Sequence, residues 1–382
     1  MKTSNPSFAR KRARRAFSLT IALSLVGLFV AANASAVPRN VFGVMPQKGL
    51  SVSDIEHMGE AKVGTLRFGL DWSGIDPSPA AGDYNFAHID ALVGEAAKQN
   101  IRLIAILATT PVWVAKDIEG SNCRAQGGGT DCAPFAPQTK AGLAAWKTFV
   151  TDVAERYGPN GEFWQQNPSI PHKPIRVWQV WNEQNSDRFY RPKPNAGKYA
   201  KLLVNAHDAL ASVDSGAEVL LGGMFRSPGG GRKPSIFSEK FLAQLYRIKG
   251  IKRYFDGVSI HPYAASVTKV KLQVDLMREA MVDARDSKAD VWITEMGWAS
   301  SGPKNPLVRG PKGQAKRLKE AFDYFLSQRR KLNLRVIIWY SWEDNRDPEV
   351  GLCEWCAGSG LLTENGKEKP SYRAFVRYTG GK

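Results

Sequence analysis

Two apolar segments of this sequence end in a glutamate that stands beside other polar or aromatic residues. Residues 177–183 read VWQVWNE and close on Asn182 and Glu183, and residues 292–298 read WITEMGW, with Glu295 inside the segment. Two carboxylates held close together can share one reaction, because an ionised one attacks as a nucleophile while a protonated one donates its proton. The fold must therefore bring together two residues more than a hundred positions apart.

Segments of strand length alternate with segments of helical periodicity over most of the chain. The pattern predicts strands at 41–45, 65–72, 101–109, 175–182, 218–224, 256–262, 290–296 and 334–342. It predicts helices at about 51–62, 85–99, 139–157, 195–213, 238–249, 268–287, 313–331 and 371–378. Continuous apolar strands indicate a parallel sheet covered on both faces, so eight such units in series predict a single (β/α)8 TIM barrel of the α/β class.

An open, doubly wound sheet is the alternative arrangement. Its first strand usually leads into a glycine-rich phosphate-binding turn, whereas residues 46–54 read PQKGLSVSD. The GGG runs at 127–129 and 229–231 lack the strand-then-helix context of a phosphate loop. We therefore expect one barrel domain over 37–382 and no cofactor.

In a barrel of this kind, reactive side chains lie at the carboxyl-terminal ends of the strands. Strands four and seven lie on opposite sides of the ring, so we expect Glu183 and Glu295 to face each other. Arg67 should keep Glu295 ionised, and tryptophan-rich surroundings should keep Glu183 protonated. This pairing is what retaining glycoside hydrolysis requires. The candidate substrate-binding residues at strand ends are Arg67, Trp72, Asn182, His261, Tyr263, Trp298, Trp339 and Trp342.

Most of the eleven tryptophans are more simply interpreted as packing residues than as ligand-binding ones. Trp146, Trp164 and Trp292 are examples. A strand-end glutamate can also be an ordinary surface charge, and it is the pair that favours catalysis. His261 is the one histidine predicted at a strand end, and neither an HxH nor an HExxH spacing is present. We therefore expect no catalytic metal.

Several short motifs resemble clan A glycoside hydrolases, in particular the family 5 and family 39 type of barrel, and the likeness runs from 38 to 378. These motifs are RFGLDWSGIDP at 67–77, TPVW at 110–113, WNE at 181–183, IHPY at 260–263, ITEMGW at 293–298 and WYSWED at 339–344. The resemblance implies that Glu183 is the general acid/base and Glu295 the nucleophile. It also implies a sugar subsite framed by Asn182, Arg67, His261 and Tyr263, with Trp339 or Trp342 as its floor. Gln184 departs from the clan, which often has proline after the catalytic NE.

Residues 1–36 are predicted to be an export signal. A basic segment without acidic residues precedes an apolar run at 17–30, and Ala34-Ser35-Ala36 fits a cleavage site. The pair Arg14-Arg15 is typical of twin-arginine signals, and the apolar run is shorter than the ~20 residues that cross a bilayer. We expect a secreted or cell-wall associated monomer without a membrane span.

The rest of the chain carries 47 basic and 36 acidic residues, a net charge of +11. This charge fits an acidic or cell-wall glycan as partner, or simply a well-solvated surface, and no basic segment with interleaved aromatics indicates nucleic acid. In an exported protein, Cys123 with Cys132 and Cys353 with Cys356 are most simply two disulfides. A zinc site from all four cysteines or a redox CxxC is the alternative.

Three functions remain compatible with these residues. A retaining glycosidase is the first, and a cell-wall transglycosylase would use the same two carboxylates with a sugar acceptor in place of water. A barrel that binds carbohydrate without cleaving it is the third. The sequence does not specify the sugar, because one barrel hosts many substrates.

Overall fold

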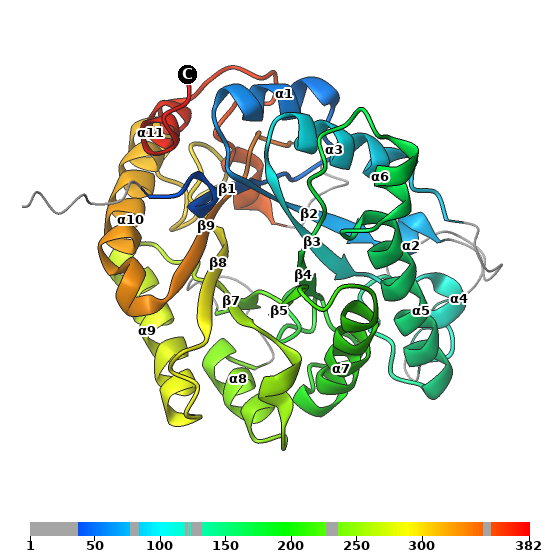
Figure 1. Cartoon of the computed structure of the whole chain (residues 1–382). Coiled ribbons are helices and arrows are strands. Elements are labelled where there is room, and N and C mark those ends of the chain that lie inside the picture. The colour runs from blue at the N-terminus through cyan, green and yellow to red at the C-terminus, as the bar shows by residue number, and fades with distance from the viewer. Residues whose placement is uncertain are drawn as a thin grey trace, which may run out of the picture. The chain divides into compact units, whose positions relative to one another are not determined.

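The computed structural model describes residues 37–76, 84–118, 121, 123, 132–226, 236–346 and 353–382. The predicted export signal at 1–36 and the two GGG runs lie outside the described residues. In the described part, parallel strands form a closed ring surrounded by helices, as Figure 1 shows. The prediction of a (β/α)8 barrel is confirmed.

The strands lie in the sheet order β5-β4-β3-β2-β1-β9-β8-β7-β6, and a further pairing of β5 with β7 closes the ring. Their bounds are β1 (Phe42–Met45), β2 (Thr65–Asp71), β3 (Arg102–Ala108), β4 (Val177–Val180), β5 (Glu218–Leu221), β6 (Met224–Phe225), β7 (Gly257–His261), β8 (Asp290–Met296) and β9 (Leu334–Tyr340). All eight predicted strands are present, and the fifth is split into β5 and the short β6.

Helices cover the outside of this ring. The longer ones are α1 (Val52–Glu60), α3 (Ala87–Lys98), α5 (Lys140–Tyr157), α7 (Ala196–Val213), α8 (Ser238–Tyr246), α9 (Val267–Asp283), α10 (Gly310–Leu332) and α11 (Pro370–Thr379). Short helical turns that the periodicity did not predict are α2 (Trp72–Ile75), α4 (Val112–Ala115), α6 (Glu162–Gln166), η1 (Arg39–Val41), η2 (Ile251–Tyr254) and η4 (Glu354–Gly358).

Local sequence explains where several helices begin. The side chain before each of α1, α5, α7 and α9 accepts a hydrogen bond from the backbone N–H three residues further on, which satisfies a donor that the helix leaves unpaired. These capping residues are Ser51, Thr139, Asn195 and Ser266. Each helix then packs its apolar face on the barrel.

The interior of the barrel is a packed apolar core. Its buried cluster consists of Ile104, Val177, Leu220, Trp292, Val336 and Ile338. Because side chains alternate along a strand, the intervening residues of the same strands face the helices. The core thus fills the ring beneath its carboxyl-terminal end, and the interpretation of Trp292 as a packing residue agrees with this cluster.

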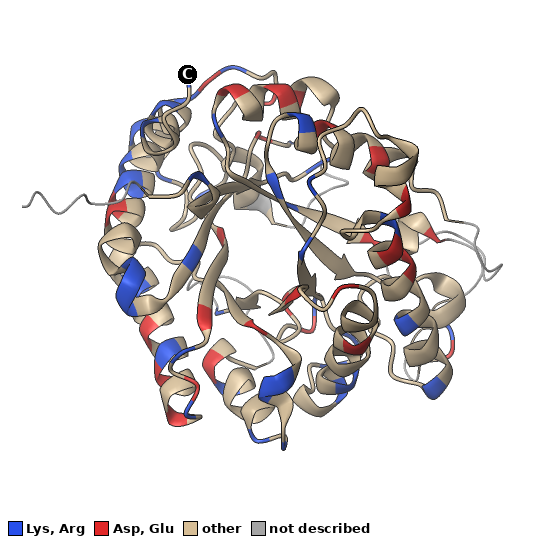
Figure 2. Ribbon diagram, in the orientation of Figure 1, with Lys and Arg blue, Asp and Glu red and all other residues tan. Residues whose placement is uncertain are grey.

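Basic and acidic residues are both distributed over the outer helices, as Figure 2 shows. Ion pairs such as Arg156 with Asp90 and Arg317 with Glu320 belong to this surface. All four cysteines are disulfide-bonded, Cys123 to Cys132 and Cys353 to Cys356. Within the described ranges, none of the helices has the length and apolar character that crossing a membrane requires.

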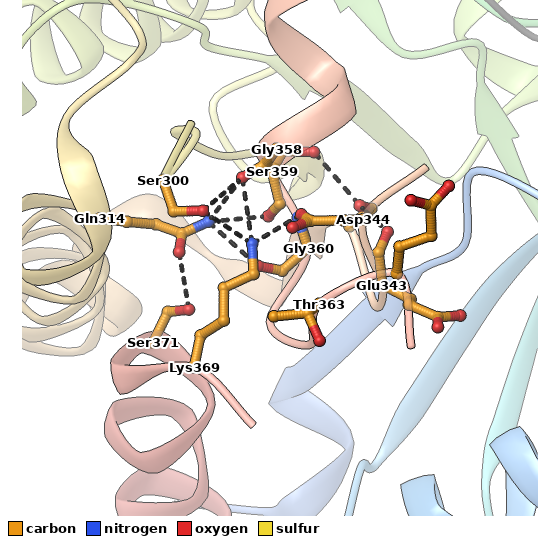
Figure 3. Close-up of polar contacts among 12 residues, drawn as sticks. Ser300, Gln314, Glu343, Asp344, Gly358, Ser359, Gly360, Thr363, Lys369 and Ser371 are labelled. Atoms are coloured by element: carbon orange, nitrogen blue, oxygen red, sulfur yellow. Dashed lines mark hydrogen bonds and ion pairs between the residues drawn. The ribbon is translucent and has the colours of Figure 1, made fainter. Parts of the chain in front are cut away.

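The segment after β9 is anchored by a buried ion pair (Figure 3). Lys369 Nζ lies 2.6 Å from Asp344 Oδ1 and also donates to Ser300 Oγ at 2.9 Å and to the Gly358 carbonyl at 3.2 Å. Burial raises the pKa of Asp344 and lowers the pKa of Lys369, and the attraction between the two groups opposes both effects. The attraction within the pair therefore offsets part of the cost of burying both charges.

We expect Lys369→Met to lower the free energy of unfolding by about 3–5 kcal/mol, because it leaves the Asp344 carboxylate buried without its cation. Denaturant unfolding measures this change. The control is the double variant Lys369→Met/Asp344→Asn, which removes both charges and should recover much of the loss. A free energy of unfolding for Lys369→Met that lies within about 1 kcal/mol of the wild-type value would contradict the role of the pair.

Candidate active site

The structure gathers the predicted polar residues at the carboxyl-terminal end of the barrel. Arg67 belongs to β2, Glu295 to β8 and His261 to the end of β7, and Asn182 and Glu183 follow β4 directly. One oxygen of Glu183, one oxygen of Glu295 and a ring nitrogen of His261 all lie within 4.8 Å of one another. Both carboxylates are buried, with 8% and 7% of their surface exposed. An oxygen-to-oxygen distance of at most 4.8 Å is compatible with the roughly 5–5.5 Å between the carboxyl groups of retaining glycosidases.

Glu295 lies in a strongly polar environment. Arg67 Nη1 donates to its Oε1 at 2.6 Å, and the Tyr263 hydroxyl donates to its Oε2 at 2.8 Å. Burial alone would raise the pKa of Glu295, but electrostatic interactions with His261 and Arg67, with the hydrogen bonds from Arg67 and Tyr263, outweigh burial and lower it. Glu295 is therefore the ionised member of the pair.

Glu183 has the opposite electrostatic character. Burial raises its pKa, and the nearby charge of Glu295 raises it further, while the hydrogen bond and electrostatic interaction with His261 act against this shift. His261 Nδ1 lies 2.8 Å from Glu183 Oε1. At neutral pH the pair thus combines one carboxylate that resists protonation with one carboxyl group that holds its proton more readily.

The backbone around Glu183 is unusual. Trp181 has φ +69° and Glu183 has φ +47°, and both lie in the left-handed region that side-chain-bearing residues rarely adopt. This conformation costs on the order of 1–3 kcal/mol per residue and is held by its surroundings. Here the Glu183 N–H donates to the Gly223 carbonyl at 3.0 Å, and the Trp181 indole donates to the Phe189 carbonyl at 2.7 Å. The strained turn directs the carboxylate of Glu183 toward His261.

The break between β5 and β6 also belongs to the site. A Cβ atom on Gly222 would collide with Gln184 Oε1, and one on Gly223 would collide with the His261 ring. Glycine is therefore required where these side chains press against the backbone. Gln184, which stands where the clan often has proline, donates to the Gly222 carbonyl at 3.0 Å. In this chain an amide hydrogen bond supports the loop behind Glu183.

Arg67 connects several strands. Its guanidinium donates to Gln179 Oε1 at 3.0 Å, to Asn182 Oδ1 at 2.7 Å and to Glu295, and its side chain is fully buried. Gln179 is a residue that the sequence analysis missed, although its polar side chain in the middle of an apolar strand was a usable signal. It supports the guanidinium from beneath.

Four predicted substrate-binding tryptophans do not line the site. Trp72 packs against Trp113, Trp146 and Phe149, and Trp298 packs against Trp339. Trp342 lies between His57 of α1 and Tyr372 of α11, outside the ring. All four, Trp72, Trp298, Trp339 and Trp342, are at most 1% exposed. The prediction that Trp339 or Trp342 forms the subsite floor is wrong for this structure.

The alternation of β9 explains this correction. Val336 and Ile338 face the barrel interior, so Trp339 faces the helices and Tyr340 faces inward. Tyr340 lies 6.4 Å from Tyr263 between ring centroids, and its pKa is raised by burial and by the charges of Glu295 and Glu183. Tyr340 is therefore the residue of β9 that lies beside the carboxylates.

Glu183, His261 and Glu295 are close enough to share a metal ion. The donor set does not fit a cation well, because Arg67 already supplies a buried positive charge 2.6 Å from Glu295. A divalent ion would have to bind beside this guanidinium and compete with it for the same oxygen. The site chemistry is accordingly derived from the side chains alone.

No protein-family model and no curated protein matches this chain. Among solved structures, it is similar to a family 39 glycoside hydrolase from Bacteroides cellulosilyticus, with 18% identity and a TM-score of 0.64 over 90% of this chain and 64% of that one. A β-xylosidase from Caulobacter crescentus gives 15% identity and a TM-score of 0.59 over 89% and 68% of the two chains.

A third similar structure is GH5_18 from Streptomyces cattleya in complex with GlcNAc, with 15% identity and a TM-score of 0.63 over 90% of this chain and 80% of that one. At these identities the similarity establishes a shared fold. The present chain spans less than two thirds of the length of the family 39 structure.

Proposed function

We propose that this protein is an exported retaining glycoside hydrolase that cleaves a glycosidic bond by double displacement. The observation that carries this proposal is the pair Glu183 and Glu295, with oxygens within 4.8 Å of each other and pKa values shifted in opposite directions. The names of the similar structures, a family 39 glycoside hydrolase and a β-xylosidase among them, support a carbohydrate substrate.

In the first step, Glu295 attacks the anomeric carbon and forms a glycosyl ester. The bond from that carbon to the leaving oxygen breaks, and Glu183 gives its proton to that oxygen. The hydrogen bonds from Arg67 and Tyr263 hold Glu295 ionised and oriented for attack. As the neutral ester forms, the negative charge passes from Glu295 to Glu183, which is left as a carboxylate, and the leaving group departs as a neutral alcohol.

In the second step, Glu183 is a carboxylate and takes a proton from water. The resulting hydroxide oxygen bonds to the anomeric carbon, and the bond from that carbon to Glu295 breaks. The site returns to its starting protonation, and two inversions give net retention. His261, which bonds to Glu183 Oε1, orients this carboxyl group in both steps.

Export is supported by two features of the chain. The segment 1–36 has the composition of a signal peptide, and the two disulfides are of the kind that persist in oxidising compartments. We propose a secreted or cell-wall associated location, a monomeric state and a glycan substrate. The interspersed charges of the outer helices give no preference for an acidic glycan over a neutral one.

The test is a panel of aryl glycosides and polysaccharides, with released products followed by mass spectrometry and the first-formed anomer by proton NMR. We expect release of sugar with retained configuration. Inverted product, or binding without release, would contradict the proposal. Added sugar acceptors distinguish hydrolysis from transglycosylation, since a transglycosylase would extend the acceptor in place of releasing reducing sugar.

We expect a bell-shaped dependence of kcat/KM on pH. Attack requires ionised Glu295, so activity falls at acid pH as this group, whose pKa is lowered, takes up a proton. Proton donation requires protonated Glu183, so activity falls at alkaline pH as this group, whose pKa is raised, loses its proton. Initial rates on an aryl glycoside with a poor leaving group measure both limbs. The alkaline limb should be weaker for an aryl glycoside with a good leaving group, which needs little proton donation, and an equally steep alkaline limb for both substrates would contradict the role of Glu183.

A further inference from the structure

Trp355 lies beside the candidate active site on the segment after β9. Its ring centroid is 5.3 Å from that of Tyr263, with an angle of 68° between the ring planes. The Tyr263 hydroxyl in turn donates to Glu295 Oε2 at 2.8 Å. A single side chain therefore separates Trp355 from the proposed nucleophile. Neither the motifs nor the strand pattern had singled out this residue.

Trp355 differs from most other tryptophans in being partly exposed. All eleven tryptophans lie in the described residues, and nine of them are buried. Only Trp113 and Trp355 are half-buried. Trp113 forms an edge-to-face contact with Trp72, and its indole N–H donates a hydrogen bond to the Asp76 carbonyl at 3.3 Å. Trp355 is the half-buried tryptophan that contacts the residues around Glu295.

The turn that carries Trp355 is fixed at both ends. The Cys353–Cys356 disulfide brackets the residue, and Gln47 Nε2 donates to the Cys356 carbonyl at 2.9 Å. The same Gln47 amide bonds to Ser341 Oγ at 2.6 Å, which ties the turn to the end of β9. An aromatic side chain on such a support loses little conformational freedom when a ligand packs on it.

The buried network of Figure 3 fixes the end of η4 from the other side. Gln314 Nε2 donates to the carbonyls of Ser359 and Gly360 at 3.0 and 3.1 Å, and Lys369 bonds to the Gly358 carbonyl. These contacts hold the short 3-10 helix η4, and with it the indole ring of Trp355, in place. A tryptophan kept half-exposed on a rigid support is suited to binding more than to core packing.

We infer that Trp355 is a substrate-positioning residue, a platform on which the glycone packs its apolar face. This inference rests on the proposed function. The glycone is the sugar whose anomeric carbon Glu295 attacks, and Trp355 reaches the site through Tyr263 on the Glu295 side. The C–H groups on one face of a pyranose ring form an apolar surface that packs against a flat aromatic ring.

The experiment compares Trp355→Ala, Trp355→Tyr and the control Tyr254→Ala. Tyr254 is also a half-buried aromatic residue, but it lies in η2 before β7, at the opposite end of the barrel. The probes are p-nitrophenyl glycosides of glucose, xylose, galactose and mannose for kinetics, and xylotriose and cellotriose for binding by saturation-transfer NMR. Melting temperatures of all variants show that each one is folded.

We expect Trp355→Ala to raise KM by about 2- to 10-fold with little change in kcat, because packing on a platform contributes equally to the bound substrate and the transition state. Trp355→Tyr should retain most of the affinity, and Tyr254→Ala should leave both constants unchanged. A purely structural role of Trp355 would instead lower melting temperature without a selective rise in KM.

The outcomes separate the two proposals. If the wild type hydrolyses a probe and Trp355→Ala leaves its KM unchanged, the inference is overturned while the proposed function stands. If the wild type binds a trisaccharide without cleaving any probe, and Trp355→Ala loses that binding, Trp355 is confirmed as a residue that binds sugar while the proposed function fails. A wild type that neither binds nor cleaves any of these probes contradicts both.

Discussion

Glu295→Gln is expected to lower kcat by at least about 10⁴-fold while the protein remains folded. Glutamine has nearly the same shape and still accepts a hydrogen bond from Tyr263 or Arg67, so the barrel should keep its structure. It cannot form the glycosyl ester, because a neutral amide is a poor nucleophile. Steady-state rates on an aryl glycoside, with circular dichroism to verify the fold, measure the effect.

The matched control is Glu279→Gln, the same chemical change on the exposed face of α9. This variant should have wild-type activity. Mass spectrometry after incubation with a 2-deoxy-2-fluoro glycoside adds a direct readout, since the trapped sugar should be bonded to Glu295 in the wild type. Near-full activity of Glu295→Gln, or a label on another residue, would show that the roles are assigned wrongly.

Glu183→Ala is expected to slow hydrolysis by about 10²–10⁴-fold and to be partly rescued by azide. Without Glu183 no base activates water in the second step, so the glycosyl ester accumulates when the leaving group needs no acid. Azide is a nucleophile that carries no proton to remove. It should therefore attack the ester and release a glycosyl azide with the same anomeric configuration as the substrate.

The control for this experiment is Glu295→Ala with azide. In that variant azide occupies the space of the missing nucleophile and attacks the substrate directly, so the glycosyl azide should have inverted configuration. Proton NMR distinguishes the two products. The reverse pattern of configurations would exchange the roles of the two glutamates, and no azide product from either variant would contradict double displacement.

The barrel was predictable because its signal repeats along the whole chain. Each predicted strand has a counterpart in the described structure, and the two glutamates follow from their places at the ends of β4 and β8. The convergence of these two residues with Arg67, His261 and Tyr263 follows from the geometry of a closed parallel ring. It is harder to predict from the sequence which of two neighbouring side chains at the end of a strand faces the barrel interior.

Trp339 and Tyr340 illustrate the difficulty. Their order along β9 gives opposite orientations, and choosing between them requires knowing which of two neighbouring positions faces the interior. The resemblance implied Trp339 or Trp342 as the floor of the subsite, whereas both side chains are buried outside the barrel interior. The positive φ values of Trp181 and Glu183 were likewise invisible, because neither residue type signals a left-handed conformation.

Trp355 could not be found from periodicity, because it belongs to a loop whose position depends on distant partners. Gln47 and Gln314 lie far from it in sequence, and both bond to the segment that holds it. The cysteine pair around Trp355 was the one local signal that this turn is fixed. Long-range hydrogen bonds of this kind become apparent only in three dimensions.

The Arg67 side chain bonds to residues on or next to two other strands, so a variant at this position changes more than one part of the site. One guanidinium on β2 holds Asn182 and Gln179 on the β4 side and Glu295 on β8. Replacing it with a shorter or neutral side chain would alter the pKa of Glu295 and at the same time remove the hydrogen bond to Asn182, the residue next to Glu183. In this molecule, one side chain therefore links the ionisation of one carboxylate to the position of the segment that carries the other.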